Sequence, residues 1–266
     1  MSRTRIRTAA ERFAPAGALL RRRYERRFRT VGGVGALCGV YESFADAAAA
    51  APAGAALGYD HAGAAVLYRE RLDAIVPKDY PALFWLREAL PGASRVFDLG
   101  GHVGLSYYAF RRYVAYPAGL RWVVCDVPAV TAEGEAIARE RGESALEFTN
   151  DPEQMTGADV LLAAGSLQYI ERPVDVLLAG LARRPRHVLI NQMPTHATRE
   201  FVTLQNIGVA FCPYRVARVD AVPEALGRLG YELVDRWDDP SRQVALPYHP
   251  EASPVAYTGF YLRLRD

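Results

Sequence analysis

A glycine-rich run that begins with an acid is the part of the sequence best suited to ligand binding. It spans residues 98–104 and reads DLGGHVG. Glycines allow tight backbone turns and close approach to a ligand, and the free N–H groups at the start of a following helix attract an anion. Asp98 adds a carboxylate that can accept a hydrogen bond from an ammonium group. The run therefore predicts a ligand site, although a tight turn in any α/β protein could carry similar glycines.

Two further polar positions follow at the ends of later apolar runs. Asp126 comes 22 residues after Gly104, and an acid there can accept hydrogen bonds from both hydroxyls of a ribose. Asn150 and Asp151 follow the next run and are placed to meet an adenine amino group. Together these positions suit S-adenosylmethionine (SAM), which carries a carboxylate, an ammonium, a sulfonium and a ribose. The glycines at 100, 101 and 104 do not fit the G-x-G-x-x-G spacing of nicotinamide-binding enzymes.

Short apolar runs alternate with helix-length segments from residue 94 onward, which predicts a βαβ series and a mostly parallel sheet. The two closing strands have no helix between them and predict an antiparallel hairpin. The expected strands are 95–99, 122–125, 146–149, 160–164, 187–190, 231–237 and 256–264, and the expected helices are 103–113, 129–141, 174–182 and 222–229. The predicted fold class is α/β, with a Rossmann-like sheet and the glycine run between the first strand and its helix.

The N-terminal third has a different pattern. Apolar residues recur at three- and four-residue steps across 61–90, which predicts helices interrupted by Pro77 and Pro81. We therefore expect a helical segment or cap over residues 1–90 and a SAM-binding domain over residues 91–266. An irregular stretch near 191–220 is expected to form a substrate loop, because long irregular segments in compact domains are often binding loops. A loop that only covers the sheet edge is the alternative.

With these motifs the sequence resembles a class I SAM-dependent methyltransferase. More narrowly, it is similar to a poorly characterised bacterial family of methyltransferases found with polysaccharide and secondary-metabolite genes. The likeness is carried by residues 58–60 (GYD), 97–101 (FDLGG), 161–170 (LLAAGSLQYI), 203–205 (TLQ) and 230–233 (GYEL). It implies the fold and a SAM site but no substrate. The expected cofactor-binding residues are Asp98, Gly100, Gly101, His102, Gly104, Asp126, Val127, Asn150, Asp151, Gly165 and Ser166.

The acceptor is expected beside the residues that leave the fourth and fifth parallel strands. Methyl transfer is an in-line displacement that depends mostly on positioning, and a base is needed only for a weakly acidic nucleophile. The candidate catalytic residues are Gln168, Tyr169 and His196, and the candidate substrate-binding residues are Asn191, Gln192, Phe211, Tyr214 and Arg215. Gln168 stands where plant-type small-molecule O-methyltransferases carry a histidine base, and glutamine cannot take a proton at neutral pH.

Several of these candidates have structural alternatives. Tyr169 could be a packed aromatic residue, His196 and His61 could be surface residues, and His102 could face either the SAM carboxylate or solvent. Arg215 is expected to hold an anionic substrate if the 191–220 stretch is a binding loop. The leading hypothesis is a SAM-dependent methyltransferase acting on an O, N or C atom of a small molecule or biosynthetic intermediate. A SAM-fold enzyme with other chemistry and a catalytically silent SAM-binding scaffold are the alternatives.

Composition narrows the remaining classes of function and the expected location. The net charge is +2, and ten arginines fall within residues 1–30, where they suit either a surface for an anionic partner or a solvated helix. Near-balanced charge argues against a nucleic-acid binder. The three cysteines, Cys38, Cys125 and Cys212, are too scattered for a disulfide framework or a metal site, so a cytoplasmic location is expected. No apolar run is long enough for integral membrane contact, and homo-oligomer formation is left open.

Overall fold

The computed structural model describes residues 14–30, 35–65, 67 and 69–266. Its main feature is a sheet whose strands run in the order β1-β7-β8-β6-β5-β2-β3-β4, with β10 on β6 and β9 on β10. The strands are β1 (Ala36–Tyr41), β2 (Arg95–Leu99), β3 (Arg121–Cys125), β4 (Leu146–Thr149), β5 (Val160–Ala164), β6 (His187–His196), β7 (Phe201–Asn206), β8 (Phe211–Arg218), β9 (Tyr231–Asp238) and β10 (Ala256–Leu264).

The helices connect and cover these strands. They are α2 (Ala14–Phe28), α3 (Phe44–Ala49), α4 (Ala62–Ala65), α5 (Tyr80–Ala89), α6 (Leu105–Phe110), α7 (Pro128–Arg141), α8 (Val174–Ala179) and α9 (Ala221–Arg228). Short 3₁₀ turns are η1 (Arg69–Arg71), η2 (Pro77–Asp79), η3 (Pro152–Met155), η4 (Leu167–Tyr169) and η5 (Pro250–Ala252). The N-terminal portion is less helical than predicted, because turns precede α5 and β1 joins the sheet.

Strands β4, β3, β2, β5 and β6 are parallel, and β10 and β9 add an antiparallel edge. The α/β class, the mostly parallel sheet and the closing antiparallel pair are thus confirmed. Asp98 in β2 pairs with Val124 of β3 and Leu162 of β5, so the strands end at a common edge. In an open α/β sheet the crevice beyond that edge is where ligands bind.

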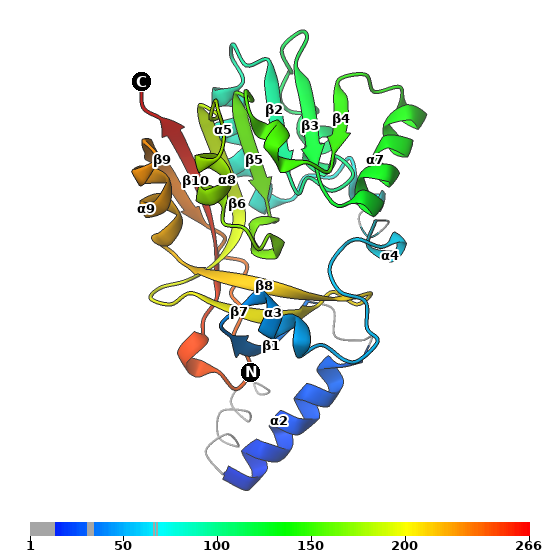
Figure 1. The fold of residues 1–266 in the computed structure, drawn as a ribbon, viewed down its shortest axis with the longest axis vertical. Coiled ribbons are helices and arrows are strands. Elements are labelled where there is room, and N and C mark those ends of the chain that lie inside the picture. The colour runs from blue at the N-terminus through cyan, green and yellow to red at the C-terminus, as the bar shows by residue number, and fades with distance from the viewer. Residues whose placement is uncertain (1–13, 31–34, 66, 68) are drawn as a thin grey trace.

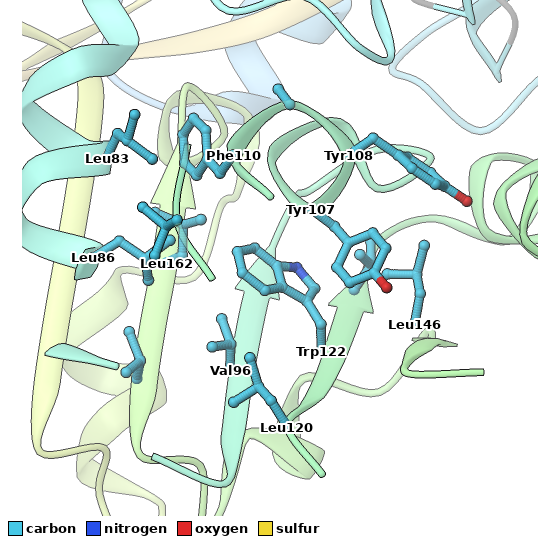
Figure 2. Close-up of a cluster of buried hydrophobic side chains, with 14 of the residues drawn as sticks. Leu83, Leu86, Val96, Tyr107, Tyr108, Phe110, Leu120, Trp122, Leu146 and Leu162 are labelled. Carbon is cyan, nitrogen blue, oxygen red and sulfur yellow. The ribbon is translucent and has the colours of Figure 1, made fainter. Parts of the chain in front are cut away.

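Both faces of the parallel sheet are buried, which explains the continuous apolar strands. One core cluster packs under α5 and α6, where Figure 2 shows Trp122 beside Val96, Leu120 and Tyr107. A second cluster packs under α8 and α9 around Leu178. Trp122 is wholly buried, and it brings its indole N–H to the edge that carries Asp98. The core therefore positions the first candidate site residue directly.

The 191–220 stretch is not a loop, which corrects the prediction. It forms the end of β6, then β7 and β8, and these last two pair antiparallel while β1 pairs with β7. We call β1, β7 and β8 the second sheet; Figure 1 shows it lying across the carboxyl ends of the parallel strands. The second sheet can bury polar residues because backbone groups from distant parts of the chain form hydrogen bonds with them. Asn206 Nδ2, for example, donates to the carbonyls of Phe28 and Thr30 at 2.7 and 3.0 Å.

Helix α2 packs against the second sheet through its aromatic side chains. Tyr24 donates to the carbonyl of Leu37 at 2.6 Å, and Phe28 is buried against Leu204 and Phe211. The arginines Arg21, Arg22, Arg23, Arg26 and Arg27 on the same helix are exposed. Residues 1–13, which hold the other N-terminal arginines except Arg29, lie outside the described residues.

Candidate active site

Close packing explains why positions 100 and 101 of the glycine run have no side chain. Gly100 has φ +72°, and a Cβ built there would collide with the side chain of Ser166. A Cβ at Gly101 would collide with the carboxylate of Asp98. The backbone of this turn therefore lies directly against the acid that precedes it, and larger residues at either position would displace one or the other.

Asp98 is a fully buried carboxylate with one hydrogen-bond donor. Its Oδ2 accepts from Trp122 Nε1 at 3.1 Å, while Oδ1 has no partner among the residues that the structure describes. Burial raises the pKa of Asp98 to about 7, and the nearby charge of Asp126 adds to the shift. A buried carboxylate oxygen without a donor is costly, so this atom marks a place for a ligand N–H group.

Asp126 ends β3 beside the same run. Its Oδ2 accepts from the backbone N–H of His102 at 2.9 Å and its Oδ1 from that of Val127 at 2.8 Å. Burial raises the pKa of Asp126 to about 6, although both backbone donors oppose the shift. A carboxylate has about four lone-pair sites, so each oxygen of Asp126 can accept one further hydrogen bond.

Asn150 and Asp151 have structural contacts at the end of β4. Asn150 Nδ2 donates to the carbonyl of Asp126 at 2.7 Å and to Thr131 Oγ1 at 2.8 Å, which holds β3 and β4 together. Asp151 Oδ1 accepts from the N–H of Glu153 at 2.9 Å and caps η3. Both residues lie near Asp126, and their contact with an adenine stays a prediction.

His102 does not face solvent, which corrects that alternative, and its contact with a SAM carboxylate stays a prediction. Its ring is buried, and Nε2 lies 3.2 Å from the carbonyl of Ala64. Burial lowers the pKa of His102 to about 4, so the ring is neutral at physiological pH and donates from Nε2 to that carbonyl. The residue has φ +55°, a conformation uncommon outside glycine.

A segment of the N-terminal portion lies across the carboxyl ends of the strands. We call residues 59–65 the strap. His102 holds one end through Ala64, and Asp60 Oδ1 accepts from the N–H of Ala129 at the start of α7 at 2.9 Å. Sequence reasoning placed Asp60 in a family motif but missed this contact, because a capping acid 69 residues from its helix leaves no local pattern.

Three residues with amide side chains lie around Gly165, which follows the end of β5. Gln168 Nε2 donates to the carbonyl of Gly165 at 2.7 Å, and Gln192 Nε2 donates to Asp239 Oδ2 at 3.2 Å. Asn191 accepts from Trp237 Nε1 at 3.0 Å and donates to the carbonyl of Lys78 at 3.1 Å. The structure therefore brings these three predicted residues together.

Two neighbouring residues complete this edge. The N–H of Gly165 donates to the carbonyl of Asn191 at 2.8 Å, and the hydroxyl of Ser166 donates to the carbonyl of Leu99 at 2.5 Å. Both fix the end of β5 beside the glycine run. Lys78, Trp237 and Asp239 were not predicted as site residues. The available signals were that Lys78 is the sole lysine of the chain and that residues 237–239 (WDD) begin at the last residue of a predicted strand.

Tyr169 packs between the strap and the second sheet. Its ring makes edge contacts with Tyr59 and Tyr214, with centroids 5.1 and 5.3 Å apart, and its hydroxyl donates to Gln205 Oε1 at 2.7 Å. The hydroxyl of Tyr214 is buried against that of Tyr257 at 2.9 Å, and burial raises the pKa of Tyr214 well above its usual value. These contacts favour the packing interpretation of Tyr169 over a catalytic one.

Three other predicted residues have structural contacts of their own. Arg215 donates to the carbonyls of Ile170 and Glu171, at 3.3 and 2.5 Å, and lies over the Phe44 ring, which favours a structural role over an anion clamp. Phe211 packs against Phe28 of α2, with centroids 5.5 Å apart.

His196 is the last residue of β6 and lies away from Asn191. It comes five residues after Asn191 on β6, a distance of about 16 Å along a strand. Its Nδ1 accepts from the N–H groups of Thr198 and Arg199 at 3.2 and 3.1 Å, and its ring lies edge-on to Phe201. The residue stabilises the turn between β6 and β7, because β6 continues beyond the predicted end at Ile190.

Comparison with solved structures identifies this architecture. The N-terminal domain of EvdMO1 with SAH bound matches at a TM-score of 0.50 and 17% identity, over 72% of this chain and 83% of that one. The chain has a Rossmann-like class I methyltransferase fold. The same domain in the presence of SAH and D-fucose matches equally, over 85% of its length.

A third structure similar to this methyltransferase fold is the 1,6-didemethyltoxoflavin-N1-methyltransferase of Burkholderia thailandensis, with 20% identity and a TM-score of 0.49 over 81% of this chain and 95% of that one. No protein-family model and no curated protein matches the sequence.

Within the described ranges, no three His, Cys, Asp or Glu residues form a group that could hold a metal ion. In the same part of the chain, no helix is both long and apolar enough to cross a membrane.

Proposed function

We propose that this protein is a SAM-dependent methyltransferase that acts on a small molecule. The observation that carries the proposal is the buried Oδ1 of Asp98, which has no donor among the described residues and lies beside Gly100 and Gly101, where no side chain fits. Asp126 supplies a second, partly buried carboxylate at the next strand end. The fold, which places such a turn at the carboxyl edge of a parallel sheet, supports the same cofactor.

The residues at this edge fit SAM in polarity. Asp98 would accept a hydrogen bond from the ammonium group, and Asp126 would accept from the ribose hydroxyls with its remaining lone pairs. SAM supplies a methyl group on a positively charged sulfur. Other residues expected to line the cofactor are Gly100, Gly101, His102, Gly104, Val127, Asn150, Asp151, Gly165 and Ser166. In this proposal His102 contributes its backbone, since its ring binds the strap.

Gln168, Asn191 and Gln192 would orient the acceptor. Each is buried and fixed by hydrogen bonds, so the group that they bind would be held in one position, and positioning supplies much of the rate in a transfer of this kind. An amide is not protonated at neutral pH, so these side chains would not take a proton from the nucleophile. Tyr169 would exclude water by packing under the strap.

The class of acceptor follows from the same comparisons. The EvdMO1 domain was crystallised in the presence of SAH and D-fucose, which supports a small-molecule acceptor here. We infer a biosynthetic intermediate, in keeping with the resemblance to enzymes of polysaccharide and secondary-metabolite clusters. A cytoplasmic location is supported by three cysteines that are free thiols.

Calorimetry with SAM and SAH tests the proposal. Wild-type protein should bind both, and an Asp98→Asn variant should bind each at least tenfold more weakly, since an amide keeps the Trp122 contact but not the charge. Glu135→Gln, on an exposed part of α7, is the matched control and should bind like the wild type. Absence of binding at millimolar concentration would refute the proposal, as would full affinity in an Asp98→Ala, Asp126→Ala double variant.

A further inference from the structure

Two buried amide oxygens, one just after β5 and one within β6, lie without a donor among the described residues. Gln168 and Gln192 are each 5% exposed, and the Oε1 atom of each has no hydrogen-bond partner within the described part of the chain. Buried polar atoms in native proteins are nearly always paired, so each of these two atoms calls for an explanation.

The orientation of both amides is fixed by their nitrogen atoms. Gln168 Nε2 faces the carbonyl of Gly165, and Gln192 Nε2 faces the carboxylate of Asp239. Carbonyl and carboxylate oxygens only accept hydrogen bonds, so rotating either amide by half a turn would bring two acceptors together. The unpartnered atoms are therefore oxygens in both residues.

The two glutamines are neighbours through Gly165. Gln168 binds the carbonyl of this glycine, and a Cβ built on it would lie 3.8 Å from the Cβ of Gln192. Gln192 has φ +56° and lies where the pairing of β6 with β10 shifts register, which re-aims its side chain. The third amide at this edge, Asn191, has both ends paired.

We propose that Gln168 and Gln192 bind the acceptor through hydrogens that the acceptor donates, so that the group methylated, or its immediate neighbour, is a hydroxyl or an amine. This inference rests on the proposed function and specifies its substrate class. Two acceptor oxygens, with the carboxylate of Asp239 behind one of them, repel a carboxylate or phosphate group at this position. The acceptor end that reaches the strand ends is uncharged or cationic.

Crystals of the wild-type protein with SAH, soaked separately with glycerol, ethanolamine and acetate, test the inference. Glycerol or ethanolamine should place an oxygen or nitrogen within hydrogen-bond distance of both Oε1 atoms, and acetate should be excluded. Binding of glycerol identifies a hydroxyl acceptor, and binding of only the amino end of ethanolamine identifies an amine. Acetate at this position, SAH atoms on both oxygens, or a bound water that neither donor probe displaces would overturn the inference.

Variants separate this site from the cofactor site. Gln168→Leu and Gln192→Leu should bind SAH within twofold of the wild type and lose at least tenfold in affinity for the probe that binds. Gln243→Leu, at an exposed loop position, is the control and should change neither affinity. An equal loss of SAH affinity in the two variants would assign the glutamines to the cofactor instead. If wild-type protein does not bind SAH, the proposed function fails, while the same soaks without SAH still test the glutamine pair.

Discussion

The backbone N–H of His102 donates to Oδ2 of Asp126, so the glycine turn of one strand fixes the acid at the end of the next. Val127 N–H occupies the other oxygen. An Asp126→Asn variant must place an NH₂ group against one of these two donors. We expect a loss of about 1–3 kcal/mol in the free energy of unfolding and at least a tenfold loss in SAM affinity. Urea unfolding and calorimetry measure the two effects; an unchanged stability would contradict this account of Asp126.

Asp98 should destabilise the ligand-free protein at neutral and higher pH. Its pKa is raised from 3.8 to about 7, so between these values the folded state binds a proton that the unfolded state has lost. Stability therefore falls as pH rises through this window. Asp98→Asn should be more stable than the wild type at pH 8, by at most about 4 kcal/mol, and similar to it near pH 4. Denaturant titrations at both pH values test this; equal stability at pH 8 would contradict it.

SAM affinity should depend on pH through the same carboxyl group. Asp98 must be ionised to bind an ammonium group, so wild-type affinity should rise from pH 5 and level off above about 7. The slope of this rise should be as much as a tenfold change in SAM affinity per pH unit. It should be reduced in Asp98→Asn, where Asp126, with its pKa of about 6, is the other carboxyl group of the proposed cofactor site. Calorimetry in buffers of different ionisation enthalpy should also detect proton release on binding.

The His102 ring should control the strap. His102→Gly removes the buried ring and its contact with Ala64 but suits the positive φ at this position, so we expect a loss of about 1–3 kcal/mol in the free energy of unfolding. Hydrogen exchange of residues 59–65 should become faster, and SAM should associate and dissociate faster. Exchange measured by mass spectrometry on both proteins tests the prediction, and unchanged exchange would show that Asp60 alone holds the strap.

Arg215 should matter for stability and not for the acceptor. Arg215→Ala removes two hydrogen bonds to the carbonyls of Ile170 and Glu171 and the contact with Phe44, so we expect a loss of about 1–3 kcal/mol in the free energy of unfolding. KM for the acceptor should stay within twofold. A large increase in KM with unchanged stability would restore the anion clamp.

The sequence predicted the parallel sheet closely because its strands are apolar on both faces, as in β5 (Val160–Ala164), whose observed bounds match the prediction. Asp98 and Asp126 were predictable because each directly follows or ends such a strand. The second sheet was not. Its residues Thr203 and Asn206 are polar but buried, and the backbone that satisfies them comes from residues more than 160 positions away.

The same cause explains the misplaced site residues. Sequence spacing put His196 beyond a strand end at Ile190, but the strand continues to His196 by pairing with β10 up to Thr195 and with β8 at Thr195 and His196. The partners of Gln192 and Asn191, which are Asp239, Trp237 and Lys78, come from distant segments and leave no local signal. Long-range pairing, which propensity does not encode, decided these positions.

The second sheet and the strap come from chain segments separate from those that hold Asp98 and Asp126. Residues 36–65 and 201–218 form the covering side, and residues 95–166 form the platform beneath. Mutations on the covering side can therefore accumulate without altering the two carboxylates. Evolution, or directed selection in the laboratory, could redraw these two segments and so change how the site is covered, while the strand ends that carry Asp98 and Asp126 are inherited unchanged.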